Sequence, residues 1–245
     1  MEHFFVGCHQ ASDVKRFEYA MISVNRLRVR REIGARNWVM DSGAFQEIAR
    51  FGAYRHEPAE YAAEIRRWVG KGNLMAAVSQ DYMCEPAMLE KTHLPVVTHQ
   101  RLTIERYDAL LMENTGAYIM PVLQGYQPEQ YRQHVRAYRD RLRPGMWVGV
   151  GSVCKRNSDP RSIEEVLLAI RDERPDLRLH GFGVKITSLA SSVVQALLWS
   201  ADSNAWSYAA RREGRSPHDW REGERYQKKV AGQPVQHHLF VQAVA

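Results

Sequence analysis

The sequence predicts an α/β fold in which eight parallel strands close into one barrel. Eight short apolar runs of strand length recur along the chain, and segments with helical period lie between most of them. This alternation favours βα units, in which each strand is followed by a helix that packs on the sheet. A chain of 245 residues is long enough for one such barrel without a second domain.

The predicted strands are apolar along their length, as strands buried on both faces are. In chain order they are HFFVG (3–7), AMISV (20–24), WVMDSG (38–43), LMAAVSQD (74–81), AYIMPVLQG (117–125), MWVGVGS (146–152), LRLHGFGV (177–184) and LLWSADS (197–203). Three of these runs carry an aspartate at or close to their carboxyl end. In parallel α/β folds that end of the strand carries the chemistry rather than the core.

Apolar residues at helical spacing predict the helices that cover the barrel. The clearest faces are Tyr61, Ile65, Trp68 and Val69, then Tyr131, Val135, Tyr138 and Leu142, then Ile163, Val166, Leu167 and Ile170. Ser162 and Glu165 have the spacing of a capping box, which predicts a helix start at the third face.

The end of the chain differs in composition from the rest. The segment from Arg211 to Gln236 is polar with scattered Gly and Pro, which is typical of a surface extension or of partial disorder. We therefore expect residues 1–210 to form the barrel and residues 211–245 to form a basic extension packed on or near it.

Composition indicates an ordinary globular protein, with 44% hydrophobic and 25% charged residues. The sequence has no apolar run of membrane-spanning length and no signal-peptide pattern at its start, so we expect a cytoplasmic protein that does not enter a membrane. Cys8, Cys84 and Cys154 are isolated, and His237 and His238 have no cysteine partner. We expect no metal, disulfide framework or cofactor.

Asp41, Asp81 and Asp202 end three of the predicted strands. In an eight-stranded α/β barrel the carboxyl ends of the strands converge on one mouth, however far apart they lie in the sequence. Carboxylates gathered there can divide labour, one as a nucleophile and another in proton transfer. The alternative is that each aspartate caps the helix that follows it.

Two further motifs lie at predicted strand ends. VGVGS places Gly149 and Gly151 where a flat ligand could approach backbone N–H groups closely, although its spacing is not that of a dinucleotide-binding motif. LQGY carries Gln124, whose amide can donate to and accept from a heterocyclic edge, or can serve as a buried structural group.

Basic residues gather in three clusters, and the net charge is +6. The clusters are Arg132, Arg136, Arg139 and Arg143, which share one helical face; Arg26, Arg28, Arg30 and Arg31; and a third set that begins with Arg211 and Arg212. Such clusters suit contacts to a phosphate backbone, and the alternative is a solvated surface.

Taken together, DSGAFQ, SQDYMC, VLQGY, VGVGS, HGFGV and SADSNAWS resemble the ordered motifs of the tRNA-guanine transglycosylase superfamily, over residues 38–207. The SADSNAWS form and the compact length resemble most the branch that places 7-deazaguanines in DNA, the deoxypurine-in-DNA protein A type. The resemblance implies a TIM barrel that exchanges guanine in DNA for a 7-deazaguanine base.

The resemblance also implies a role for each matching residue. Asp202 would be the nucleophile at C1′ of the sugar, and Asp41 would transfer a proton to or from the base. The residues expected to bind the base are Ser42, Phe45, Asp81, Gln124, Gly151, Ser152 and Phe182, with the two phenylalanines on either side of its ring. Arg132, Arg136, Arg139, Arg211 and Arg212 are the expected contacts to the nucleic acid.

The sequence departs from the tRNA enzymes in two places. No cysteine follows Cys154, so their zinc subdomain is expected to be missing, which favours DNA over tRNA as the partner. Lys155 and Arg156 stand where the bacterial tRNA enzymes carry an acid that pairs with an aminomethyl group, which favours 7-cyano-7-deazaguanine as the incoming base. The alternatives are a tRNA-guanine transglycosylase, a base-excising glycosylase, and a catalytically idle nucleic-acid-binding subunit; a homodimer or a partner protein is compatible with all of them.

Overall fold

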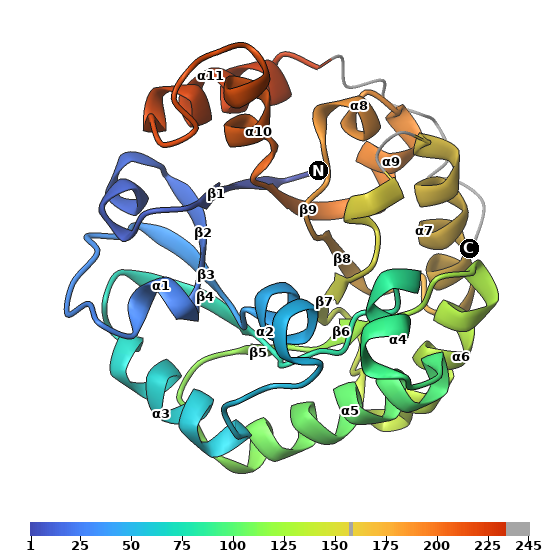
Figure 1. Ribbon diagram of the computed structural model, residues 1–245. Helices are drawn as coiled ribbons and strands as arrows, with labels where there is room; N and C mark the ends of the chain where they lie inside the picture. The colour runs from blue at the N-terminus through green and yellow to red at the C-terminus, as the bar shows by residue number, and fades with distance from the viewer. Residues whose placement is uncertain (157–158, 234–245) are drawn as a thin grey trace.

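The computed structural model describes residues 1–156 and 159–233, and in this part of the chain parallel strands form a barrel surrounded by helices (Figure 1). The strands are β1 (His3–Cys8), β2 (Tyr19–Ser23), β3 (Asn37–Asp41), β4 (Asn73–Val78), β5 (Ile119–Met120), β6 (Val122–Leu123), β7 (Trp147–Val150), β8 (Arg178–Gly181) and β9 (Leu198–Ser203). Each predicted strand overlaps one of these elements, or contains two in the case of residues 117–125.

The sheet order is β5-β4-β3-β2-β1-β9-β8-β7-β6. Its two ends, β5 and β6, are separated in the chain by Pro121 alone, which has no N–H to donate. The carbonyl of Met120 accepts from the Ser79 N–H on the β4 side at 3.0 Å, and the carbonyl of Pro121 accepts from the Gly149 N–H on the β7 side at 2.8 Å. β5 and β6 therefore act as one strand that brings the edges of the sheet together. The predicted α/β barrel is confirmed.

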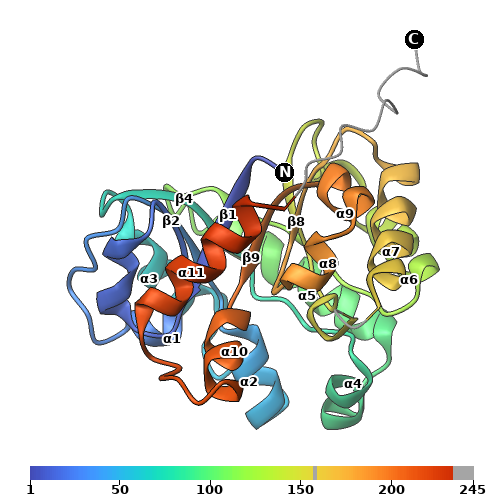
Figure 2. The ribbon, with the colours of Figure 1, turned by 90° about the horizontal axis from the view of Figure 1, so that it is seen from above.

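The helices lie around the outside of the barrel (Figure 1). They are η1 (Ala11–Arg16), α1 (Val24–Leu27), α2 (Ala44–Phe51), α3 (Pro58–Trp68), α4 (Pro86–Thr92), α5 (Val96–Met112), α6 (Pro128–Tyr138), η2 (Arg139–Arg141), η3 (Cys154–Arg156), α7 (Pro160–Glu173), α8 (Ile186–Leu189), α9 (Ser192–Leu197), α10 (Ala205–Arg212) and α11 (Trp220–Ala231). Figure 2 shows α2, α4 and α10 projecting together from one side of the barrel. Each of these helices follows the carboxyl end of a strand, so they surround the mouth.

Apolar side chains fill both faces of the sheet. One cluster lies between the strands and the helices, and the other fills the barrel interior with residues from seven of the strands. The interior cluster consists of Phe5, Met21, Val39, Ala76, Val78, Met120, Val122 and Trp147. It forms a packed floor beneath the mouth, as the interior layers of such barrels do.

The predicted helix faces are largely confirmed. Tyr61, Ile65 and Trp68 are buried on α3, whereas Val69 follows the helix end and is 40% exposed. The expectation for Val69 was wrong because the helix ends one residue earlier. The third face is buried on α7, as predicted.

Two predicted helix details are wrong. The helix that carries Tyr131 ends at Tyr138, since Arg139 has a φ of 51°, so Arg139 and Leu142 do not continue its faces. The helix predicted to start at Ser162 begins at Pro160, with Asp159 as its N-cap accepting from the Arg161 N–H. Asp159 and a proline at the first position supply the start signal instead of the capping box.

The segment after Arg211 contains the helix α11, which packs against the barrel. Tyr226 and Val230 are buried, and the Tyr226 hydroxyl accepts from the Ile186 N–H at 2.8 Å. Gly223 lets the helix lie close to Phe17, because a Cβ there would come within 2.9 Å of its ring. His237, His238 and the rest of residues 234–245 lie outside the described residues. No helix in the described ranges is long and apolar enough to cross a membrane.

Candidate active site

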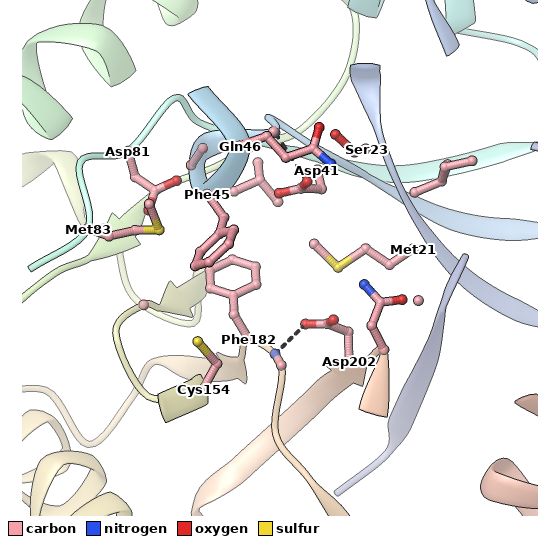
Figure 3. A pocket seen from close by; sticks show the side chains of 18 of the residues that line it. Met21, Ser23, Asp41, Phe45, Gln46, Asp81, Met83, Cys154, Phe182 and Asp202 are labelled. Atoms are coloured by element: carbon pink, nitrogen blue, oxygen red, sulfur yellow. Dashed lines mark hydrogen bonds between the residues drawn. The ribbon is translucent and has the colours of Figure 1, made fainter. Parts of the chain in front are cut away.

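A cavity of about 320 Å³ opens at the carboxyl ends of the strands (Figure 3). Its volume is at the lower end of the range for small-molecule pockets. The lining includes eight residues singled out from the sequence: Asp41, Phe45, Asp81, Gln124, Gly151, Ser152, Phe182 and Asp202. The strands that carry them are distant in sequence, and barrel closure brings them together.

Asp202 enters the cavity from β9, next to β1. Asp202 pairs with Phe5 across the two strands, and the residue is 6% exposed. Oδ1 accepts the Gly183 N–H at 3.0 Å, which Figure 3 shows as a dashed line. One carboxylate oxygen is therefore fixed by the backbone of the neighbouring loop.

Asp41 enters the same cavity from the end of β3. Burial, together with the negative charge of Asp202, raises the pKa of Asp41 from 3.8 to about 6. The Gly43 N–H donates to Oδ2 at 3.1 Å and opposes this rise. Gly43 has a φ of 79°, a conformation that favours glycine, and it turns the chain from the aspartate into α2. Asp41 can thus carry a proton near neutral pH.

Asp81, Gln124 and Ser152 form a buried polar chain along another wall. The Gln124 amide donates to Oδ2 of Asp81, and its carbonyl oxygen lies 2.7 Å from Oγ of Ser152. Burial is the main cause that raises the pKa of Asp81 from 3.8 to about 7, although the hydrogen bond from Gln124 lowers it. Both ends of the Gln124 amide are therefore held by protein partners, which fixes the edge that faces the cavity.

The two glycines of VGVGS leave room for protein side chains. A Cβ on Gly149 would come within 2.4 Å of the Phe182 ring, and one on Gly151 within 2.1 Å of the Gln124 amide. The Gly151 N–H donates to the Leu123 carbonyl at 2.9 Å, so the sheet uses that donor. The predicted contacts of Gly151 and Ser152 to the base stay a prediction.

The two phenylalanines predicted to hold the base both line the cavity. Phe182 lies over Gly149, and Phe45, on α2, is 47% exposed at the mouth. Figure 3 shows both rings directed toward the middle of the pocket. Their predicted stacking on the base stays a prediction.

Ser42 lies behind the pocket and is absent from its lining. The residue is buried, and its Oγ is 3.2 Å from the hydroxyl of Tyr54, which in turn donates to the Asp81 carbonyl at 3.1 Å. Ser42 thus supports the wall that carries Asp81, whereas the sequence had placed it against the base.

The predicted basic contacts fall into two groups. Arg132 donates to Asp172 at 2.8 Å, and Arg136 donates to Glu173 at 3.0 Å, so both arginines join α6 to α7. Arg211 and Arg212 end α10, one of the helices that surround the mouth. The second group is the better placed of the two to meet a polymer at the cavity.

Other lining residues were not among the predicted site residues, and they include His9, Arg26, Glu85, Cys154 and Asn204. Glu85 is the least expected of these, because its position before Pro86 indicates only the start of a helix. Asn204 lies inside the SADSNAWS motif, and Arg26 belongs to the second basic cluster, so both carried a signal. Nothing about His9 in the sequence distinguished it from the other scattered histidines.

The barrel and its mouth define the class first: an α/β-barrel protein with four carboxylates and two phenylalanine rings in one pocket, the arrangement of a barrel enzyme. Residues 1–221 match the family described as DeoxyPurine in DNA protein A. The chain belongs to this family, the 7-deazaguanine DNA transglycosylases, whose role is guanine exchange in DNA. No curated protein matches the chain.

Proposed function

We propose that this protein replaces guanine in DNA with 7-cyano-7-deazaguanine through a covalent ester between Asp202 and the deoxyribose. The main support is the pairing of two carboxylates in one cavity. Asp202 has one oxygen fixed by the Gly183 N–H, and Asp41 has a pKa of about 6 that the charge of Asp202 helps to raise. A nucleophile and a proton carrier with different environments are what a double displacement requires.

In the first displacement an oxygen of Asp202 attacks C1′, the C1′–N9 bond breaks, and its electron pair leaves with guanine. The departing base takes up one proton, which Asp41 supplies in its protonated form. The target nucleotide must first leave the DNA stack, at a cost of a few kcal/mol. Phe45 and Phe182 offset that cost by stacking on the base in the cavity.

In the second displacement the incoming base replaces guanine. The carboxylate of Asp41 accepts the proton from N9 of the deazaguanine, N9 attacks C1′, and Asp202 leaves as a carboxylate. Asp41 thereby returns to its protonated form, so one proton is given and one is taken in each cycle. A pKa of about 6 suits both transfers near neutral pH.

Asp81, Gln124 and Ser152 would recognise the edge of the base. The raised pKa of Asp81, about 7, makes both a donor and an acceptor form accessible near neutrality. Gln124 retains one N–H beyond the one it gives to Asp81. These groups match a guanine-type edge, which presents donors beside an acceptor.

The preference for a nitrile rests on the charges around the pocket. Glu85 is an acid in the lining, but its oxygens lie 3.0 Å from Oγ of Ser152 and 3.7 Å from Sγ of Cys154. At the rim, the Lys155 ammonium lies 5.2 Å from the centre of the Phe45 ring. A cationic aminomethyl group would meet that positive charge, whereas a neutral nitrile would not.

Arg26, Arg211 and Arg212 would hold the DNA backbone beside the mouth. Arg26 lines the cavity itself. Arg26 and Arg211 both act on His9, another lining residue, whose pKa is lowered first by burial and then by these positive charges. A phosphate placed there would face at least two guanidinium groups beside His9.

The test is mass spectrometry of nucleosides after incubation with duplex DNA and labelled 7-cyano-7-deazaguanine, with Asp202→Asn as the matched control. We expect label in DNA with wild-type protein alone, and much less label from the aminomethyl base. Release of guanine without incorporation would indicate a glycosylase. An equal amount of tRNA in the reaction separates the two polymers, and label only in tRNA contradicts the assignment to DNA.

A further inference from the structure

His180, on β8, lies directly behind Asp202. The imidazole is fully buried, and its Nε2 is 3.4 Å from Oδ1 of Asp202. Among the described residues, Nε2 has no hydrogen-bond partner. A buried polar atom without a partner is costly, so its position against the predicted nucleophile calls for a physical reason.

Aromatic rings on three sides prevent the imidazole from turning away. Its centre lies 4.8 Å from the ring of Phe182, 5.8 Å from that of Trp147 and 5.9 Å from that of Phe5. At the other end of the ring, Nδ1 lies 2.9 Å from Oγ of Ser200. The ring therefore has one polar neighbour on each side, Ser200 and Asp202.

The contacts around His180 favour a proton on its Nε2. Its indole N–H can only donate, and it donates to Oγ of Ser200 at 2.8 Å. Ser200 then has its own proton free for Nδ1 of His180, which leaves the imidazole proton on Nε2. The opposite tautomer would set a lone pair of Nε2 against a carboxylate oxygen in a buried site, which is unfavourable.

We propose that His180 is a positioning residue that donates its Nε2–H to Oδ1 of Asp202, fixes the orientation of the carboxylate and leaves Oδ2 to attack the sugar. This inference rests on the proposed function of Asp202. The hydrogen bond tightens from 3.4 Å when substrate closes the pocket, as catalytic hydrogen bonds commonly do. Trp147 and Ser200 act through His180 and do not touch the substrate.

Asp202 needs such a donor because its other titratable neighbours oppose its charge. Asp41 faces it across the cavity from β3, Cys154 approaches from η3, and Tyr226 lies behind it on α11. All three are acids, so none of them places a positive charge beside the buried carboxylate of Asp202. The Gly183 N–H and His180 share that task.

The first test needs no substrate. In ¹⁵N NMR spectra of wild-type protein at pH 7.5, the shifts of the His180 nitrogens, assigned by their loss in His180→Gln, should report a proton on Nε2. An Nδ1–H form would overturn the proposal. Because this measurement uses the free protein, it remains decisive even if wild-type protein transfers no base and the proposed function fails.

The second test uses the rate at which the covalent adduct with DNA forms, measured in single turnover from pH 5 to 9. His180→Phe keeps a packed ring and removes the donor. Loss of a hydrogen bond to a charged group should slow adduct formation by about 10- to 100-fold across this range. His180→Gln, which can still donate from an amide, should recover part of the rate.

The matched control is Leu179→Ala, which alters a buried residue of the same strand that packs among the outer apolar residues. It should lower the melting temperature without slowing adduct formation. If His180→Phe behaves like Leu179→Ala, or keeps the wild-type rate, His180 is a core residue and the proposal is wrong.

Discussion

Asp81 should destabilise the folded protein at neutral and alkaline pH. Its pKa in the folded state is about 7, against an ordinary value of 3.8, chiefly because the carboxyl is buried. The folded protein therefore keeps this proton to higher pH than the unfolded chain does. Stability contributed by the protonated form is complete below pH 3.8 and is lost as the pH rises to about 7.

The size of the effect follows from the same two values. A rise of about three pH units, at about 1.4 kcal/mol for each, corresponds to about 4 kcal/mol at pH 8. That is a large share of the roughly 5–15 kcal/mol by which domains are stable. Asp81→Asn, which is neutral and can still accept from Gln124, should recover much of it while weakening base recognition.

Urea unfolding of wild type and Asp81→Asn at pH 5, 6.5 and 8 measures the difference directly. The advantage of the variant should grow with pH and level off above about 7, where Asp81 of the folded wild type is ionised. A difference that is constant across this range would show that Asp81 titrates normally in the folded protein. It would also remove the proposed reason for two protonation states at the base edge.

Three further predictions concern the reaction. Asp202→Asn should form no adduct on denaturing gels, whereas Asp41→Asn should form some adduct but fail to turn over. Normal activity in a folded Asp202→Asn variant would exclude Asp202 as the nucleophile. Phe182→Ala should weaken binding of the base by about 5- to 150-fold in calorimetry, from a stacking energy of about 1–3 kcal/mol. Arg211→Glu should flatten the dependence of DNA affinity on salt. The control is Arg136→Glu, which should affect this dependence little because Arg136 is already paired with Glu173. Equal effects of the two substitutions would contradict a DNA contact at Arg211.

The strands and the cavity lining were predictable because both depend on local sequence. Each strand is an apolar run, and residues at the carboxyl ends of parallel strands meet whatever their separation. Asp41, Asp81 and Asp202 could therefore be placed in one pocket before the fold was known. The first strand, β1, pairs with the last, β9, because the barrel closes, and the count of eight apolar runs already implied this closure.

Features that depend on side-chain packing were not predictable. Gly149 gave the same signal whether a ligand or Phe182 occupied the space beside it. Arg136 reads as a free cation until the position of Glu173 is known. Glu85 and His180 lie in segments with ordinary helix and strand signals. The contact of Glu85 with Ser152 joins residues more than 60 positions apart, and His180 is notable only because it lies against Asp202.

The pairing of β1 with β9 has a consequence for how the proposed site assembles during folding. Phe5 and Asp202 are neighbours across this seam although nearly the whole described chain lies between them. Such a contact forms late, since it requires the closure of a very long loop. A partly opened chain would keep the proposed base-binding wall of Asp81 and Gln124 without the proposed nucleophile opposite. Loss of this seam would therefore abolish the proposed attack by Asp202 before it abolishes binding of the base.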